Sequence, residues 1–110
     1  MIVLPWPDQR LSPNARTHWA VKSPVTKAAR MLACYVTKGT GARVEHDGPI
    51  AMRVTFCAPD RRHRDRDNCI ACCKAYMDGI ADALGVNDRR FEPTYAWGQP
   101  VKGGAVEVAL

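Results

Sequence analysis

The stretch IAMRVTFCA, residues 50–58, alternates apolar side chains with smaller or more polar ones. Alternation with a period of two is typical of a β-strand that buries one face. Pro59 ends the run, because proline has no N–H to donate within a sheet. We therefore expect a strand that packs against the core and delivers the residues after Pro59 at the end of a rigid element.

A densely charged segment, PDRRHRDRDN at residues 59–68, follows directly. It places Asp65 and Asp67 two positions apart, and in an extended chain such side chains lie on one face. Two carboxylates so placed could share a hard cation such as Mg²⁺, and the neighbouring arginines could bind phosphate bidentately. The alternative is a solvated surface loop with local ion pairs, which are common and weak.

A helix is predicted next, capped by Asp67 or Asn68 and ended by Gly85. Lys74 lies seven residues after Asp67, and helical side chains lean toward the N-terminus, so Lys74 would point back toward the aspartates. There it could stabilise a scissile phosphate, a water or a leaving oxygen. Otherwise it pairs with Asp78 at i,i+4. Positions with helical apolar spacing are Ile70, Cys73, Met77, Ile80, Ala81 and Leu84.

The remaining elements complete a single domain over residues 1–110. A short strand is expected at 2–4, and a first helix with Ser23 as N-cap and Pro24 at its first position, stopping at Gly39 or Gly41. A hairpin of 94–97 with 106–110 is expected at the C-terminus. The predicted fold class is therefore α/β, in the order βαβαββ. Both main helices pack on one mixed sheet, and the acidic site lies at the edge of that sheet.

Composition points to an anionic partner. The chain has 110 residues and a formal net charge of +5, which favours nucleic acid but is also compatible with an acidic protein or a membrane surface. It has no run of about 18 apolar residues, and Pro5 interrupts the N-terminus before a signal-peptide core could form. We therefore predict a cytoplasmic protein without membrane association.

Two further features have alternative interpretations. The segment 8–23 mixes cations with Trp19, which could stack on a base or could cap the core. The five cysteines include a C-x-x-C pair at Cys69 and Cys72, but no second pair stands at zinc-finger spacing. Small core residues are the better interpretation of these thiols.

Several motifs occur in a fixed order along nearly the whole chain. They are LPWP at 4–7, SPN at 12–14, PDRR at 59–62 running into RDRDN at 64–68, DGIADAL at 78–84 and ND at 87–88. In this order and at this spacing the chain resembles the RusA family of Holliday junction resolvases, which are small phage and bacterial endodeoxyribonucleases. The D-x-D-N motif alone would be weakly specific, whereas the combination of motifs is specific.

The resemblance implies a Mg²⁺-dependent homodimer, with Mn²⁺ as a possible substitute, that nicks two strands of a four-way DNA junction symmetrically. By that match Asp65, Asp67 and Asp88 are the metal-binding catalytic acids. Many relatives place a lysine four residues after the second aspartate, where this chain has Ala71. Lys74 is the nearest substitute and is assigned the catalytic role. No small-molecule cofactor is expected.

Metal-bound carboxylates would polarise the scissile phosphate and activate a water, leaving a 5′-phosphate and a 3′-hydroxyl. The DNA affinity should fall steeply with salt, because cations bind the phosphates. The residues expected to bind DNA are Asn14, Arg16, Lys27, Arg61, Arg62, Arg64, Arg66 and Arg89. Two alternatives remain open: a module that binds DNA without cutting it, and a nuclease that acts on other branched DNA or on ordinary duplex.

Overall fold

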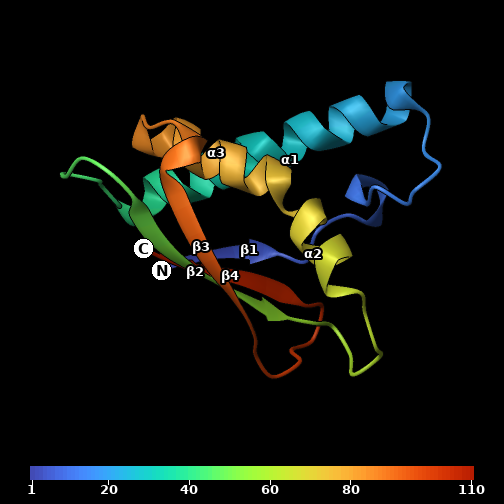
Figure 1. The fold of residues 1–110 in the computed structure, drawn as a ribbon. Coiled ribbons are helices and arrows are strands. Elements are labelled where there is room, and N and C mark those ends of the chain that lie inside the picture. The colour runs from blue at the N-terminus through green and yellow to red at the C-terminus, as the bar shows by residue number, and fades with distance from the viewer.

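The computed structural model describes residues 1–110 and folds them into one mixed sheet with helices on one face (Figure 1). Seven helices and strands are joined by two short 3-10 turns, η1 and η2. In chain order the elements are β1 Ile2–Pro5, η1 Gln9–Leu11, α1 Trp19–Thr40, β2 Ile50–Cys57, α2 Arg66–Cys72, α3 Lys74–Leu84, η2 Asp88–Arg90, β3 Phe91–Trp97 and β4 Ala105–Ala109.

The sheet has the strand order β1-β4-β2-β3. Strand β2 is one of the two inner strands, and its Val54 pairs with Val108 of antiparallel β4 on one side and with Tyr95 of parallel β3 on the other. The mixed sheet is confirmed, but the predicted C-terminal hairpin is wrong, because β3 and β4 flank β2 instead of pairing with each other. The intervening segment is held to the end of β2 by hydrogen bonds from Gly98 N to Phe56 O and from Val101 N to Ala58 O.

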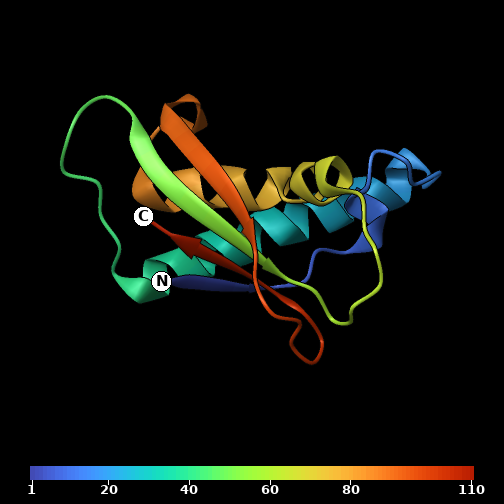
Figure 2. The ribbon, with the colours of Figure 1, turned by 60° about the horizontal axis from the view of Figure 1, so that its bottom comes forward.

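One face of the sheet carries the core. Figures 1 and 2 show the three α-helices together on this face, and the opposite face is uncovered. The strand at 50–58 behaves as predicted, with Met52, Val54 and Phe56 buried while Ala51 and Arg53 are exposed. The core also contains Ile2, Leu4, Val106 and Val108 from the other strands, Ala33, Cys69, Tyr76 and Ile80 from the helices, and Cys73 from the turn between α2 and α3.

The first helix begins earlier than predicted. Its N-cap is His18, whose Nδ1 accepts a hydrogen bond from Ala20 N at 3.1 Å, so Ser23 is not the cap. Pro24 lies inside α1, where its missing N–H leaves the carbonyl of Ala20 without the usual helical donor. The predicted stop at Gly41 is confirmed: this glycine has a left-handed φ of 73° and donates to Lys38 O.

The second predicted helix is divided in two. Asp65, not Asp67 or Asn68, is the N-cap of α2, and its side chain accepts from Asn68 N at 3.2 Å. The chain turns at Cys73, with φ −90° and ψ 0°, before α3 begins. The order is therefore βαβααββ. The apolar stripe is confirmed, since Cys73, Ile80 and Ala81 are buried and the other predicted positions pack against the core.

The two long helices are in close contact. A Cβ added to Gly79 would lie 2.1 Å from the carbonyl oxygen of Arg30 and 2.8 Å from Cβ of Ala33, so this crossing requires glycine. Beside it, the Arg30 guanidinium donates to both carboxylate oxygens of Asp82, at 2.7 and 2.8 Å. These contacts fix α3, and the side chains at its N-terminus, against the flank of α1.

None of the helices combines the length and the apolar character that crossing a bilayer requires.

Candidate nucleic-acid interface

The charged loop, residues 59–65, connects the end of β2 to α2 and is organised by Arg64. Its Nη1 donates to the carbonyl oxygens of Asp60 and Arg62, at 3.2 and 2.9 Å, and its Nη2 lies 2.9 Å from Asp60 Oδ1. The Arg64 side chain is only 13% exposed, and its guanidinium lies over the ring of Trp6, 5.5 Å from the centroid. Arg64 is therefore an internal brace of this loop, and its contact with DNA stays a prediction.

The carboxylate of Asp60 completes this brace. Arg62 N donates to Asp60 Oδ1 at 2.9 Å. This backbone hydrogen bond, followed by the hydrogen bond from Arg64, lowers the pKa of Asp60 below its usual value. The loop thus has a defined shape without any ligand, as a preorganised binding surface requires.

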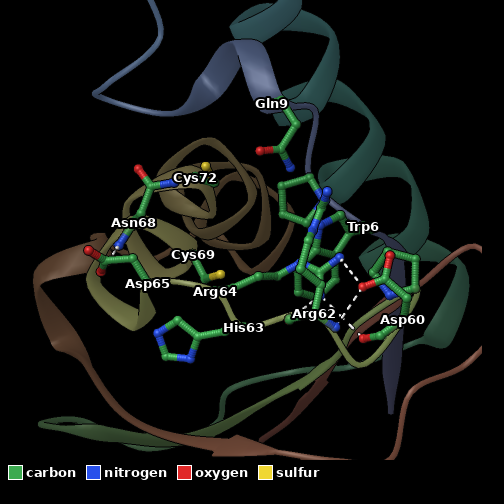
Figure 3. A pocket seen from close by; sticks show the side chains of 12 residues that line it. Trp6, Gln9, Asp60, Arg62, His63, Arg64, Asp65, Asn68, Cys69 and Cys72 are labelled. Carbon is green, nitrogen blue, oxygen red and sulfur yellow. Dashed lines mark hydrogen bonds and ion pairs between the residues drawn. The ribbon is translucent and has the colours of Figure 1, made fainter.

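Beside the loop lies a pocket of about 460 Å³ (Figure 3). Figure 3 shows Arg64 reaching across it toward Asp60 and Trp6, while Asp65 and Asn68 lie at the start of α2. The lining combines an aromatic ring, basic groups, amides and a carboxylate, chiefly Trp6, Gln9, Asp60, Arg62, His63 and Asn68. Sequence analysis did not assign Trp6, Gln9 or His63 to a site. The alternation of Ile2, Leu4 and Trp6 could have placed Trp6 on the core face, toward the end of β2.

A second connection joins the SPN loop to this site. Ser12, which is 6% exposed, donates from its hydroxyl to Asn68 Oδ1 at 2.6 Å, and Asn14 N donates to the Ser12 hydroxyl at 3.2 Å. Two motifs that are 56 residues apart therefore meet at the N-terminus of α2. Asn14 itself is exposed beside them.

Several basic side chains in and beside the charged loop have no acidic partner. Arg61, Arg62 and Arg66 are exposed and form none of the ion pairs in the structure; Arg66 lies near the ring of Trp97, 5.9 Å from its centroid. The same description holds for three other predicted DNA-binding cations, Arg16, Lys27 and Arg89. These guanidinium and ammonium groups are available to phosphate.

Arg90 has a structural role that the sequence did not indicate. It donates from Nε to Gly48 O at 2.9 Å and from Nη2 to His46 O at 2.6 Å. These contacts fasten the loop before β2 to the start of β3. Because both acceptors lie more than 40 residues away in the sequence, no local pattern could have predicted them.

The two aspartates of the D-x-D motif are not in the expected arrangement. Asp65 is extended and caps α2, whereas Asp67 lies in the first helical turn, so the prediction that both share one face of an extended segment is wrong. Asp67 is exposed and forms no ion pair, and its negative charge is favoured by the helix N-terminus.

Lys74 belongs to a different group of side chains, here called the Lys74 cluster: Lys74, Asp78 and Asp88. Its Nζ lies 2.7 Å from Asp78 Oδ1 and 2.7 Å from Asp88 Oδ2. The i,i+4 pair with Asp78 is thus confirmed, and Lys74 is directed toward these two acids instead of Asp65 and Asp67. Asp88 comes from η2, which Asn87 caps by accepting a hydrogen bond from Arg89 N.

The Lys74 cluster has a clear electrostatic signature. Hydrogen bonds to Asp78 and then to Asp88 raise the pKa of Lys74, and the hydrogen bond from Lys74 lowers the pKa of Asp88. Each shift favours the charged form of the group. At neutral pH the ammonium is therefore protonated. Two of its three N–H donors are engaged, which leaves one for an external oxygen.

A magnesium site is not assembled in this structure. Carboxylate oxygens are the ligands that Mg²⁺ prefers, and Asp65, Asp67 and Asp88 have the right chemistry. However, no three Asp, Glu, His or Cys side chains in the chain are close enough together to hold a metal ion. The protein by itself therefore does not offer three such side chains to one ion.

The cysteines are core residues, as predicted. Cys57, Cys69, Cys72 and Cys73 are buried free thiols, and Cys34 is half-buried. Burial raises the pKa of the Cys73 thiol to about 12 and that of Cys69 and Cys72 as well, so these thiols are poor nucleophiles at neutral pH.

Comparison with known proteins identifies a relative without assigning an activity. No family model matches the chain. It is 43% identical, over 93 residues, to an uncharacterized protein of Xylella fastidiosa (strain Temecula1 / ATCC 700964). The match covers 82% of this chain and 61% of that protein, so the chain spans about three fifths of the length of the relative.

Proposed function

We propose that this chain is an endodeoxyribonuclease of the RusA type that resolves four-way DNA junctions in recombination and repair. The single observation that carries the proposal is the 2.7 Å pairing of Lys74 with Asp88. These residues stand 14 positions apart, and the sequence assigned both to one catalytic site. The hydrogen bond between Ser12 and Asn68 gives further support, because it joins two motifs on which the resemblance rests.

In this proposal the chain supplies positive charge where the phosphate bears negative charge. Lys74 is held by two carboxylates with one N–H donor unused, and that donor can bind a phosphate oxygen as charge develops in the transition state. Because its pKa is raised, Lys74 acts as a cationic donor and not as a base. Neither Asp65 nor Asp67 forms an ion pair. Because the side chain of Asp65 caps α2, exposed Asp67 is the acid that is available to the reacting centre. Asp65 positions α2 through its cap.

The cofactor we propose is Mg²⁺, with Mn²⁺ as a substitute. Hard oxygen donors suit both ions. The requirement is testable by removing divalent ions with EDTA and adding each ion back. A cytoplasmic location, in a bacterial or phage-infected cell, is part of the same proposal.

The decisive test is cleavage of a labelled synthetic four-way junction in Mg²⁺, with a linear duplex of equal length as the substrate control. The wild type should make paired symmetrical nicks in the junction alone. Asp67→Asn should lower the rate by at least about 100-fold, the scale expected for loss of a catalytic polar group. Asp47→Asn is the matched control, because this exposed aspartate lies in the loop before β2; it should cut normally.

Three other outcomes would each change the proposal. Equal binding by wild type and Asp67→Asn, with no cleavage by either, would replace it with a DNA-binding module that does not cut. Preferred cleavage of flaps or forks in competition with the junction would keep the nuclease and change its substrate. Equal cutting of duplex and junction would remove the structural specificity.

A homodimer is also part of the proposal, since a two-fold dimer matches a two-fold junction. The side of α1 turned away from α3 exposes an apolar stripe at helical spacing: Val21, Ala28, Met31, Leu32 and Tyr35. Tyr35 is 79% exposed and Met31 62%, and the charged residues of α1 lie outside the stripe. Exposed apolar patches of this kind mark interaction surfaces. A second copy can cover the stripe with the same uncharged stripe.

Light scattering during gel filtration tests this assembly. The wild type should have the mass of two chains, and Tyr35→Asp should have the mass of one, because the dimer would have to bury an unpaired carboxylate. A wild-type monomer at micromolar concentration would contradict the proposal.

A further inference from the structure

A groove between α1 and α3 remains unassigned by the proposed site. It has a volume of about 520 Å³, and its walls include Trp19, Ser23, Lys27 and Arg30 of α1 and Ala75 and Asp78 of α3. The small side chain of Ala75 leaves this space open. The groove reaches the Lys74 cluster through Asp78, the carboxylate that binds Lys74.

Trp19 is the most unusual residue of the groove. It is 74% exposed at the first position of α1, so the alternative prediction that it caps the core is wrong. The ring of His18 lies 5.7 Å from it at an interplanar angle of 34°. An indole is large and apolar, and its exposure in water is unfavourable unless it has a partner. A flat, accessible indole next to cations is the arrangement on which proteins stack unpaired bases.

The electrostatics of the groove are also distinctive. Arg30 is neutralised by Asp82, and Asp78 by Lys74. Lys27 has no acidic partner, and Lys22 donates only to the neutral carbonyl of Ser12, at 3.3 Å. Two positive charges are therefore left uncompensated along the wall, together with the exposed hydroxyl of Ser23, and helix α1 contains no acidic residue.

We propose that the α1–α3 groove binds unpaired nucleotides, with Trp19 stacked on a base and Lys22 and Lys27 on the phosphates. Paired bases within a duplex are stacked on each other and cannot offer a face to Trp19, so the groove selects DNA that is locally single-stranded. Such nucleotides become accessible where base pairs open beside a branch point. The inference rests on the proposed function, because the groove would guide the bound strand to the Lys74 cluster of the proposed nuclease site.

The test measures binding of a fluorescently labelled 12-nucleotide oligo(dT) by anisotropy, at several salt concentrations. Trp19→Ala should raise the Kd at least about fivefold, whereas Trp19→Phe, which keeps an aromatic face, should stay within about twofold of wild type. Lys27→Ala should weaken binding and reduce the slope of log K against log salt by about 0.7. Lys38→Ala is the matched control, because Lys38 is an exposed lysine of the same helix outside the groove; it should leave both quantities unchanged.

Failure of this inference is distinguishable from failure of the proposed nuclease. Binding of oligo(dT) that depends on Trp19, without any junction cleavage, keeps the groove and removes the nuclease. Junction cleavage with no oligo(dT) binding, or with Trp19→Ala binding like wild type, overturns the groove and keeps the nuclease. Equal competition by heparin, with Trp19→Ala again indistinguishable from wild type, would show a cationic surface that does not stack bases. Circular dichroism of each variant verifies that α1 is intact.

Discussion

The Lys74 cluster and the segment that runs from the charged loop into α2 both combine basic side chains with aspartates, but in opposite electrostatic arrangements. In the cluster, one lysine is held by two aspartates at 2.7 Å, so the protein compensates its own charge. In the other region, Arg61, Arg62, Arg66 and Asp67 are exposed without ion-pair partners. Compensated charges fasten elements together, whereas uncompensated charges remain available for a ligand.

Arg64 shows that neighbours in sequence can fall on opposite sides of this division. It is braced by Asp60 and two carbonyl groups, while Arg62 stays exposed. Each of the following predictions concerns either a compensated or an uncompensated charge. The measurement shows whether that charge holds the protein together or binds DNA.

The largest effect is expected from Lys74→Gln. The variant removes the ammonium between Asp78 and Asp88, so junction cleavage should fall by about 100-fold or more, the scale for loss of a transition-state donor. Junction binding and the melting temperature should change little, because the pairs are exposed. Single-turnover cleavage with a parallel binding assay separates these effects. Lys38→Gln is the control, and normal cleavage by Lys74→Gln would remove Lys74 from the catalytic site.

An intermediate effect is expected from the arginines of the charged loop. Arg62→Ala should weaken junction binding several-fold and reduce the salt slope of log K by about 0.9, as one phosphate contact would, without altering stability. Arg64→Ala should instead increase hydrogen exchange at the Arg62 amide, because the loop loses its brace.

The control for both is Arg53→Ala, since Arg53 is exposed on the uncovered face of the sheet. A full salt-slope change in Arg64→Ala, with no increase in hydrogen exchange, would mean that Arg64 contacts DNA directly and that the brace is dispensable.

The smallest effect is the pH dependence of the Lys74 cluster. Lys74 lowers the pKa of Asp88, so this pair stabilises the fold above the unfolded pKa of about 3.9 and is lost as pH falls through the lowered folded value. The pKa of Lys74 is raised. Its contribution to the stability of the fold is therefore complete below its unfolded pKa of about 10.4, and it is lost as pH rises through the raised pKa of the folded protein.

Thermal unfolding of wild type and Lys74→Gln measures this dependence. The small difference in melting temperature should be constant between about pH 6 and 9 and should disappear once the pH has fallen through the lowered pKa of Asp88, where this carboxyl is protonated. A difference that persists there would mean that Lys74 acts through packing rather than through charge.

The sequence by itself determined those features that depend on local pattern. Alternation placed Val54 and Phe56 in the core, helical spacing placed Cys73 and Ile80 there, and Gly41 and Gly85 ended their helices. The uncompensated basic charge could also be anticipated, because exposure is the default for arginine. Lys74 was assigned to the site from its spacing along the predicted helix as well as through the resemblance, which also placed Asp88 there.

Tertiary structure alone decided the features that depend on partners distant in sequence. Whether β4 pairs with β3 or inserts between β1 and β2 depends on how the apolar side chains of the strands are buried together on one face of the sheet. The turn residues between β3 and β4 do not indicate this. Whether Arg64 binds DNA or braces its loop depends on where Trp6 and Asp60 lie, and whether Trp19 is buried depends on which side of α1 meets α3. The physical reason is the same in each case: hydrogen bonds, ion pairs and burial are properties of pairs of groups, and a single stretch of sequence contains only one member of each pair.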